Sequence, residues 1–278
     1  MIKAADDFKT GAVMVIGGGI GGIQAALDLA DSGQKVYLLE SSPAIGGVMA
    51  RLDKTFPTND CSMCILSPKL VEAARHLNIE LLTYSDLLSV TGQAGRYRVR
   101  VKHKPRYVDA DKCTGCGDCE LACPVAVPNE YEENTCQRKA IYRPYAQGVP
   151  NIFTIEKAGE PPCQQACPAS VPVQGYIALI QQGKYAEALA IVREKMVFPA
   201  VCGRVCVRFC EGVCTRNQID SPVDIMHLKR FISDWELEHA DEVEEAIEQP
   251  GVTREEKIAV IGAGPAGLQA AANLTRQG

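Results

Sequence analysis

Four cysteines at short, regular intervals are the most chemically informative feature of this chain of 278 residues. The run reads C-x-x-C-x-x-C-x-x-x-C-P and consists of Cys113, Cys116, Cys119, Cys123 and Pro124. Thiolates at this spacing hold a [4Fe–4S] cluster, and the fourth cysteine of such a run often ligates a different cluster. The alternatives are disulfides or a zinc site, which usually needs two C-x-x-C pairs set well apart. The spacing therefore predicts a cluster that carries electrons.

A glycine-rich turn near the start of the chain predicts a dinucleotide site. The apolar run 13–16 leads into Gly17, Gly19 and Gly22, and a helix-like run follows at 23–32. In such a turn the first glycine permits the tight bend and the second lets the backbone approach a pyrophosphate. The third lets the helix pack closely on the strand. The N-terminus of the helix then faces the phosphates with its free N–H groups.

The residues after this turn strengthen the prediction and point to FAD. A second apolar run, 35–39, ends in Glu40, which lies 18 residues after Gly22 and is placed to accept hydrogen bonds from a ribose. Gly46 and Gly47 complete an E-x(5)-G-G pattern that resembles the extension found in flavoproteins with two dinucleotide domains. The resemblance favours FAD over NAD, and the alternative is a glycine-rich turn in an α/β domain without a ligand.

The same glycine pattern recurs close to Gly278. A short apolar run within 257–261 precedes Gly262, Gly264 and Gly267, and a helix-like run follows at 268–277. One strand and one helix cannot form a parallel sheet, because every strand needs neighbours and both faces need cover. We therefore expect both nucleotide domains to be incomplete, the chain to be the front portion of a longer one, and NAD(P) to bind only in that longer protein.

Six further cysteines gather in a region that reads as helical. Four of them recur at every fourth residue, a period that places side chains along one helix face. We expect at least one more 4Fe–4S cluster here, with a second left open, and the alternative is a stripe of buried thiols, since free cysteine packs as a small apolar residue. These cysteines are Cys163, Cys167, Cys202, Cys206, Cys210 and Cys214.

Cys61 and Cys64 form a separate C-x-x-C pair. This spacing occurs both in redox-active dithiols and in metal sites. The pair therefore predicts either a redox dithiol beside the flavin or two cluster ligands, and two buried structural thiols are the alternative.

Composition narrows the remaining function classes. A net charge of -5 argues against nucleic-acid binding, and 46% hydrophobic residues suffice for a core. No apolar stretch approaches the roughly 20 residues that span a bilayer, and residues 1–10 lack the regions of a signal peptide. We therefore expect no transmembrane segment, and the 13 cysteines predict metal ligands in a reducing cytoplasm.

The order of motifs predicts an α/β Rossmann-type FAD-binding domain with an inserted ferredoxin-like module, followed by an α-helical iron–sulfur domain and a truncated second Rossmann βα unit. The expected bounds are 1–106 for the FAD domain, 107–160 for the 4Fe–4S module, 161–240 for the helical domain, 241–256 for an acidic linker and 257–278 for the second dinucleotide domain.

Residues 11–155 resemble the A subunit of heterodisulfide reductase, a family of anaerobic flavin-based electron bifurcation. The resemblance is carried by GGVMARLDKTFPTNDCSMCILSPK at 46–69, KPRYVD at 104–109, the four-cysteine run and RKAIYR at 138–143. It implies a flavin domain with an inserted ferredoxin module. It also implies other redox subunits or a ferredoxin as partners, in a hetero-oligomeric complex.

The region 163–234 is similar to the helical iron–sulfur domain of dihydropyrimidine dehydrogenase and of the glutamate synthase small subunit. The shared text includes FPAVCGRVC at 198–206 and CEGVC at 210–214. The chain departs from that family where Ile155 and Ala158 stand in place of an extra C-x-x-C pair. It also has Lys229 near a position where several relatives carry a Gln or Glu that completes one cluster, and a protonated lysine has no lone pair to offer.

Together these observations predict an FAD- and iron–sulfur-dependent oxidoreductase subunit that passes electrons between a flavin and two or more 4Fe–4S clusters. One alternative is an electron-input module that oxidises NAD(P)H for a partner, like the glutamate synthase small subunit. A second is a non-catalytic relay or docking subunit with a vestigial flavin site.

Overall fold

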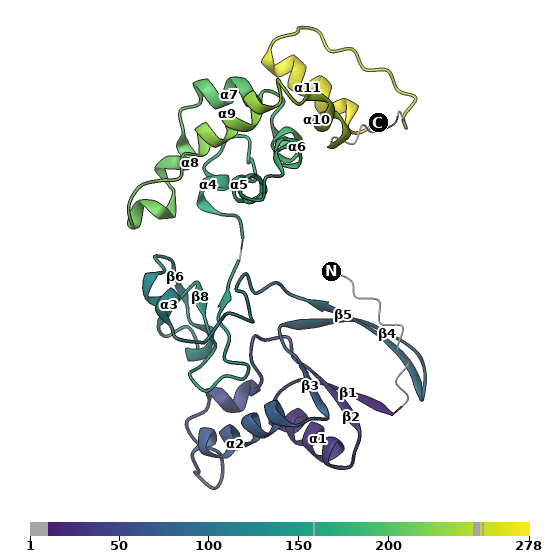
Figure 1. The fold of residues 1–278 in the computed structure, drawn as a ribbon, viewed down its shortest axis with the longest axis vertical. Helices are drawn as coiled ribbons and strands as arrows, with labels where there is room; N and C mark the ends of the chain where they lie inside the picture. Colours follow the sequence, from purple (N-terminus) through teal and green to yellow (C-terminus); the bar gives the residue numbers. More distant parts are fainter. Residues whose placement is uncertain (1–10, 158, 247–250, 252) are drawn as a thin grey trace. The chain divides into compact units, whose positions relative to one another are not determined.

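The computed structural model describes residues 11–157, 159–246, 251 and 253–278 (Figure 1). The chain divides after Lys157 into two compact units, here called the N-terminal unit and the C-terminal unit.

A three-stranded parallel sheet forms the base of the N-terminal unit. Its order is β1 (Ala12–Ile16), β2 (Lys35–Leu39) and β3 (Ile79–Leu82), and the helices α1 (Ile20–Asp31) and α2 (Ser62–Arg75) contact one another beside it. The strand, helix and strand expected around the first glycine turn are confirmed. Helix α1 buries one stripe at positions i, i+3, i+4 and i+7, as expected for a helix that covers a core. That stripe consists of Ile23, Ala26, Leu27 and Ala30.

The remainder of the N-terminal unit is built from hairpins and short helices. The chain forms a long antiparallel hairpin and then a compact segment that carries the four-cysteine run. The elements are η1 (Gly47–Arg51), β4 (Ser85–Gln93), β5 (Arg96–His103), α3 (Asp118–Ala122), β6 (Ala126–Pro128), η2 (Glu130–Glu132), β7 (Gln137–Lys139), β8 (Ile141–Tyr142) and β9 (Thr154–Ile155).

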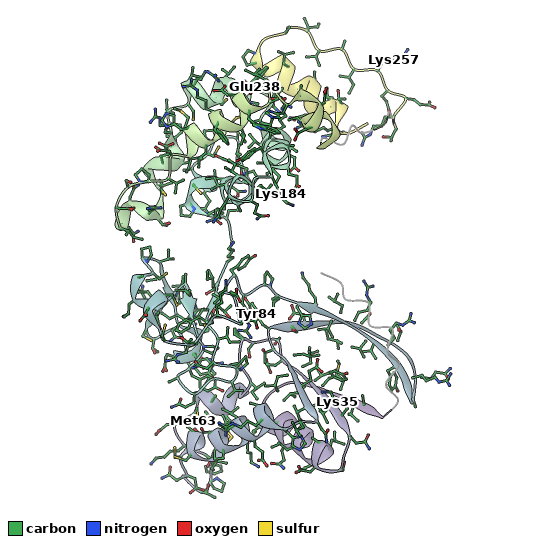
Figure 2. All side chains as sticks on the ribbon, viewed as in Figure 1. Lys35, Met63, Tyr84, Lys184, Glu238 and Lys257 are labelled. Carbon is green, nitrogen blue, oxygen red and sulfur yellow. The ribbon has the colours of Figure 1, made fainter. Side chains whose placement is uncertain are left out.

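Arg106 joins three parts of the N-terminal unit. Its guanidinium donates hydrogen bonds to the Pro43 carbonyl (2.7 Å), the Thr83 hydroxyl (2.9 Å) and the Thr154 hydroxyl (2.8 Å). It also lies over the ring of Tyr84, at 5.4 Å from the ring centre. Figure 2 labels Tyr84. The cysteine-bearing segment is therefore tied to the edge of the sheet by a half-buried cation, and burial lowers the pKa of Arg106.

The C-terminal unit is helical, as the sequence predicts for this region. Its helices are α4 (Pro162–Gln165), α5 (Val173–Gln181), α6 (Tyr185–Lys195), α7 (Pro199–Val205), α8 (Phe209–Gly212), η3 (Thr215–Gln218), α9 (Ile225–Trp235), α10 (Ala240–Ala246) and α11 (Pro265–Thr275). Helices α7 and α9 lie side by side (Figure 1). Their contact is close because Gly203 has no side chain: a Cβ there would stand 2.8 Å from the Arg230 Cα.

The expectation that four cysteines share one helix face is wrong. Cys202 lies in α7 and Cys206 follows its last residue, whereas Cys210 lies in α8 and Cys214 precedes η3. Arg208 has a φ of +63°, a left-handed conformation that does not continue a right-handed helix. The spacing of four therefore runs across three short elements.

The second glycine pattern keeps its helix but not its expected strand. Helix α11 forms, but residues 257–261 are assigned to no strand, and Ile261 is 98% exposed. A lone β-strand leaves its backbone groups unpaired, and no described segment supplies a partner here. The expected acidic linker begins as helix α10, which buries Val243 against α6, and residues 247–250 and 252 lie outside the described part.

Candidate functional site

The first glycine turn, residues 17–22, has the geometry of a phosphate cradle. Gly17 has a φ of +104°, and a Cβ at Gly22 would stand 1.8 Å from the Gly17 carbonyl oxygen, so only glycine fits both positions. Gly19 precedes α1 with φ -73° and ψ 176°, and no described atom lies within 4 Å of the position its Cβ would take. Space is therefore open beside Gly19 at the N-terminus of α1, as an anion site requires.

Glu40 is held at the end of β2 by two backbone donors. Its Oε2 accepts a hydrogen bond from the Gly18 N–H at 2.7 Å, and its Oε1 accepts one from the Ser42 N–H at 2.7 Å. Oε1 also accepts a hydrogen bond from the Ser41 hydroxyl at 3.4 Å, whereas Oε2 retains a lone pair for a further donor such as a ribose hydroxyl. The carboxylate is thus fixed beside the turn before any ligand binds.

Gly46 and Gly47 bring the segment after β2 back against the turn. The Gly46 N–H donates to the Gly18 carbonyl at 2.7 Å, and a Cβ at Gly47 would stand 2.9 Å from the Gly19 Cα. Both glycines have positive φ, +132° and +56°. The two glycine motifs of the N-terminal unit therefore form one surface.

Residues 143–151, called here the return segment, follow the cysteine-bearing segment. They contact the strip Glu40–Gly47. The Ile45 N–H donates to the Val149 carbonyl at 2.8 Å, and the Tyr145 hydroxyl donates to the Ile45 carbonyl. A Cβ at Gly46 would stand 2.5 Å from that hydroxyl. Burial raises the pKa of Tyr145, so its hydroxyl remains a donor. Motif analysis missed this tyrosine, because its partner is 100 residues away.

The second glycine turn, residues 262–267, repeats the first in detail. Gly262 has a φ of +103°, Gly264 has φ -74° and ψ 175°, and a Cβ at Gly267 would stand 1.9 Å from the Gly262 carbonyl oxygen. Helix α11 is fixed to the C-terminal end of α6, because Arg276 donates to the carbonyls of Arg193 and Glu194. The turn is thus formed without the strand that precedes it in the first copy.

Cys113 and Cys116 of the ferredoxin-type run lie on one loop, and Cys119 follows in the first turn of α3. Gly115 and Gly117 separate them and have φ values of +73° and +95°, which lets the loop curl. Burial raises the pKa of the Cys119 thiol, and the Cys116 and Cys113 thiols raise it further, so the three sulfurs lie within electrostatic reach of one another.

This loop is anchored, and the fourth cysteine has its own contact. The Arg143 guanidinium donates to the Asn151 side-chain oxygen at 2.9 Å, and a Cβ at Gly115 would stand 2.5 Å from the Asn151 amide nitrogen. The Cys123 thiol donates to the Val125 carbonyl with 3.7 Å between sulfur and oxygen. The loop is therefore preformed on the return segment of the same unit.

Cys61 and Cys64 are exposed and hydrogen-bonded to each other at the start of α2. The Cys61 sulfur accepts from the Cys64 N–H at 3.3 Å. A hydrogen bond from the Cys64 thiol lowers the pKa of Cys61, and the same contact raises the pKa of Cys64. This asymmetry is typical of a C-x-x-C pair with one reactive thiolate. The alternative of two buried structural thiols is wrong, because both side chains are exposed.

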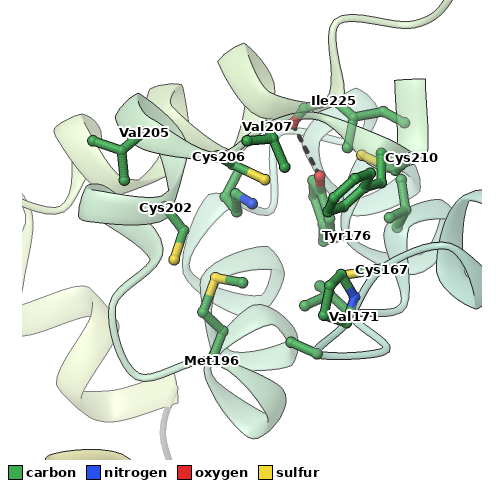
Figure 3. Close-up of a pocket in the computed structure, with 15 residues that line it drawn as sticks. Cys167, Val171, Tyr176, Met196, Cys202, Val205, Cys206, Val207, Cys210 and Ile225 are labelled. Atoms are coloured by element: carbon green, nitrogen blue, oxygen red, sulfur yellow. Dashed lines mark hydrogen bonds between the residues drawn. The ribbon is translucent and has the colours of Figure 1, made fainter. Parts of the chain in front are cut away.

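Four cysteines from three segments line one apolar pocket in the C-terminal unit, called here the cysteine pocket. The cavity measures about 320 Å³, and its walls include Tyr176, Met196 and Lys229. Tyr176 is 1% exposed, and its hydroxyl donates to the Ile225 carbonyl at 3.1 Å (Figure 3). The cysteines are Cys167, which follows α4, Cys202 and Cys206 from α7 and its end, and Cys210 from α8.

Cys163 and Cys214 form a second association beside this pocket. Burial raises the pKa of the Cys163 thiol, with smaller contributions from the Cys214 and Cys167 thiols. Helices α4 and α8, which precede Cys167 and Cys214, contact each other. The structure thus separates the six cysteines of this unit into a group of four and a neighbouring pair.

No group of three or more His, Cys, Asp or Glu side chains in the described ranges is arranged to hold a single metal ion. The thiolates of a cubane cluster bind four different irons, so they surround a larger object than one ion. The described residues also include no helix long and apolar enough to cross a membrane.

Three family models match separate parts of the chain. A model described as FAD dependent oxidoreductase matches residues 12–60, which hold the first glycine turn. A 4Fe-4S binding domain matches residues 104–125, and the dihydropyrimidine dehydrogenase domain II with its 4Fe-4S cluster matches residues 156–241. The predicted FAD domain and the two predicted 4Fe–4S regions are confirmed by these matches.

Curated relatives agree with the first resemblance. The iron-sulfur A subunit of a CoB--CoM heterodisulfide reductase from Methanopyrus kandleri is 58% identical over 146 residues, which are 52% of this chain and 22% of that protein. About half of this chain is homologous to the heterodisulfide reductase A subunit. The A subunit of the H(2):CoB-CoM heterodisulfide,ferredoxin reductase of Methanothermobacter marburgensis is 54% identical over 52% of this chain and 22% of its own length. The chain therefore spans about a fifth of the length of these relatives.

Two further proteins show weaker similarity. An Archaeoglobus profundus protein named for its likeness to the heterodisulfide reductase A subunit is 49% identical over 56% of this chain and 26% of its own length. Among solved structures, L-proline dehydrogenase from P. horikoshii is 25% identical over 35% of this chain and 20% of that chain. Its TM-score is 0.29, too low to inform the fold.

Proposed function

We propose that this chain is an oxidoreductase subunit that passes electrons between FAD and 4Fe–4S clusters, in the manner of the heterodisulfide reductase A subunit. One observation carries the proposal. The glycine cradle and the ferredoxin-type loop belong to one compact unit, and the strip Glu40–Gly47 is hydrogen-bonded both to the cradle and to the return segment that anchors the loop. Electron transfer between two redox groups requires that they be held at a fixed, short separation, which this strip is suited to provide.

The residues that would hold FAD are those of the first cradle. Gly17, Gly19 and Gly22 would leave room for the pyrophosphate, and Glu40 would accept hydrogen bonds from the ribose. The open space beside Gly19 fits this assignment, since a phosphate there would meet the free N–H groups of α1. Bound FAD would supply the exchange between paired and single electrons.

The residues that would hold clusters fall into two sets. Cys113, Cys116 and Cys119 would bind one cluster, with Cys123 or a more distant cysteine as the fourth ligand. In the C-terminal unit the four residues of the cysteine pocket would bind another. Its apolar walls fit this assignment, because a cluster is bound by thiolates that need shelter from water. Those four ligands are Cys167, Cys202, Cys206 and Cys210.

The finer parts of the proposal concern context. The inserted position of the ferredoxin module, electron bifurcation, and assembly with other redox subunits or a ferredoxin follow from the similarity to the heterodisulfide reductase A subunit. A cytoplasmic location is supported by the use of cysteine as thiol: all 13 cysteines are free in the structure.

The test of the flavin site is a glycine substitution that the apo fold tolerates. Gly19 has a backbone conformation open to any residue and no described neighbour near its Cβ, so Gly19→Val should fold normally. We expect this variant to lose FAD after anaerobic purification, because the added methyl groups occupy the pyrophosphate position. Released flavin fluorescence measures the content. Gly21→Ala, which also meets nothing within 4 Å, is the matched control and should keep FAD. Equal FAD in both variants would contradict the site.

Iron and acid-labile sulfide analysis tests the clusters in the same preparations. We expect iron and sulfide for at least two cubane clusters, together with an EPR signal after dithionite reduction. Stoichiometric zinc without sulfide would overturn the cluster assignment. FAD absent from the wild-type chain with clusters present would instead favour a relay or docking subunit.

A second candidate is an electron-input module that takes hydride from NAD(P)H for a partner. The repeated glycine turn after a dihydropyrimidine dehydrogenase-type domain favours it. Anaerobic reduction of a viologen dye by NADH or NADPH separates the two candidates. We expect negligible turnover by residues 1–278. Rapid turnover by this chain would favour the input module.

A further inference from the structure

Helix α9 carries a lysine at a position where its pattern demands an apolar side chain. Its buried stripe falls at positions i, i+1, i+4, i+7 and i+8, the face that an amphipathic helix turns to a core. The middle member is Lys229, which is 6% exposed. The members of the stripe are Ile225, Met226, Lys229, Ile232 and Ser233.

The side chain of Lys229 belongs to the wall of the cysteine pocket. Burial is the main influence on the Cys202 and Cys210 thiols and raises their pKa values, whereas Lys229 lowers both. The lysine is therefore within electrostatic reach of cysteines on α7 and on α8. Because Lys229 also lines the pocket, it belongs to the site and not only to the helix.

Lys229 has no anionic partner among the described side chains. The nearby buried carboxylate, Glu211, accepts a hydrogen bond from the Met226 N–H at 2.9 Å and lies 3.9 Å from Arg208. No ion pair or side-chain hydrogen bond in the described part of the chain involves the Lys229 ammonium. The Lys229 side chain is largely buried and lacks a counter-charge, which is costly, so the geometry calls for an anion in the pocket.

A four-thiolate cluster is such an anion. The negative charge of four thiolates exceeds the positive charge of the iron–sulfur core, and one-electron reduction adds a further negative charge. We propose that Lys229 is a positioning residue that sits against the cluster of the cysteine pocket and raises its reduction potential. This inference rests on the proposed function of the pocket as a cluster site.

The effect follows from electrostatics. A nearby positive charge stabilises the reduced cluster more than the oxidised one, because the reduced form carries one more negative charge. The net charge around a cluster is one of the factors that set its potential. The electron comes from the chemical reductant of the titration and enters the iron–sulfur core, with no bond to the protein formed or broken. Lysine supplies this charge as a compact point, without a free lone pair to bind iron.

The test is an anaerobic potentiometric titration of the full chain, followed by EPR. Cys206→Ala first identifies which EPR signal belongs to the pocket, because that signal alone should disappear. The potential of the assigned signal is then compared among wild type, two neutral variants, Lys229→Met and Lys229→Leu, and the charge-preserving Lys229→Arg. Lys195→Met removes an exposed charge from α6 and serves as the matched control.

We expect both neutral variants to lower the ratio of reduced to oxidised cluster at a fixed potential by about tenfold or more, which is 59 mV for one electron. Lys229→Arg and Lys195→Met should remain within a few-fold of wild type. Iron and sulfide contents, measured on every variant, show that the cluster is present.

The two proposals fail in different ways. A wild-type chain without any signal that Cys206→Ala removes would overturn the pocket as a cluster site, and the lysine inference with it. A pocket cluster whose potential is unchanged in the neutral variants would overturn the lysine inference alone. So would a shift in Lys229→Arg as large as that in Lys229→Met, since charge would then not be the cause.

Discussion

The Glu40 carboxylate accepts a hydrogen bond from the backbone N–H of Gly18, 2.7 Å away, in the middle of the first glycine turn. The end of β2 and the turn after β1 are therefore joined directly. A residue that the motif assigns to a ribose also shapes the loop that faces the pyrophosphate. The Glu40 side chain thus helps to position both the ribose site and the pyrophosphate site of a dinucleotide.

Replacement of Glu40 by alanine should loosen the turn even without a ligand. The variant loses two charge-assisted hydrogen bonds, from Gly18 and Ser42, and bonds of this kind stabilise by roughly 1.5–3 kcal/mol each when buried, less here because Glu40 is half-exposed. We expect a lower urea midpoint by circular dichroism and reduced FAD retention. Glu80→Ala removes a carboxylate from β3 that forms an exposed ion pair with Lys35, and it should change neither. Unchanged FAD content in Glu40→Ala would contradict the ribose assignment.

Gly22→Ala should disrupt the first turn. The added Cβ would stand 1.8 Å from the Gly17 carbonyl oxygen, so the helix must move away from the strand. Overpacking of this kind typically costs about 1–3 kcal/mol. We expect loss of FAD and a lower unfolding midpoint by circular dichroism. The control Gly21→Ala lies one residue earlier in open space, and an equal effect of both substitutions would show that the turn is not closely packed.

Gly203→Ala should destabilise the C-terminal unit and leave the flavin site intact. A Cβ at this position meets the backbone of Arg230, which forces α7 away from α9. The chain has one tryptophan, and Trp235 lies in α9, so its fluorescence reports this unit. We expect the fluorescence transition to move to lower urea by about 1–3 kcal/mol of unfolding free energy, with FAD content unchanged. Gly212→Ala, which meets nothing within 4 Å, should leave the transition in place.

The exposed C-x-x-C pair should show two different alkylation profiles. The hydrogen bonds from Cys64 lower the pKa of Cys61, so its thiolate persists to lower pH, while the pKa of Cys64 is raised. Rates of iodoacetamide labelling, followed by peptide mass spectrometry, should therefore rise at lower pH for Cys61 than for Cys64. Cys64→Ala removes the thiol donor, and the Cys61 profile should then move to higher pH. Protection of both residues until iron is removed would identify them as cluster ligands instead.

Local rules were sufficient where one short segment determines the geometry. Gly17 and Gly22 each meet a steric demand that arises within six residues, so the strand, turn and helix were predictable and are confirmed. The four-residue spacing from Cys202 to Cys214 led to a wrong prediction of one shared helix face, because that prediction requires one continuous helix. Arg208 adopts a left-handed conformation, and the helices on either side are too short for the period to matter.

Contacts between distant segments were beyond any motif. Tyr145 reaches Ile45 across 100 residues, and Arg106 reaches Pro43 and Thr154 across 63 and 48 residues. Neither the type of a residue nor its spacing in the sequence predicts a hydrogen-bond partner in so distant a segment. The strand expected at 257–261 failed for the opposite reason: its own residues suit a strand, but no described segment supplies the neighbour that a strand requires.

The three hydrogen bonds of Arg106 have a consequence for the order of folding. Its acceptors come from the sheet edge and from β9, so one of them arrives only when the chain has completed its excursion through the ferredoxin-type loop. Until then the half-buried Arg106 guanidinium lacks one of its hydrogen-bond acceptors. The hydrogen bond from the Tyr145 hydroxyl to the Ile45 carbonyl is also missing. The sheet edge beside the glycine turn and the cysteine-bearing segment should therefore gain their protection from hydrogen exchange together, as one cooperative block.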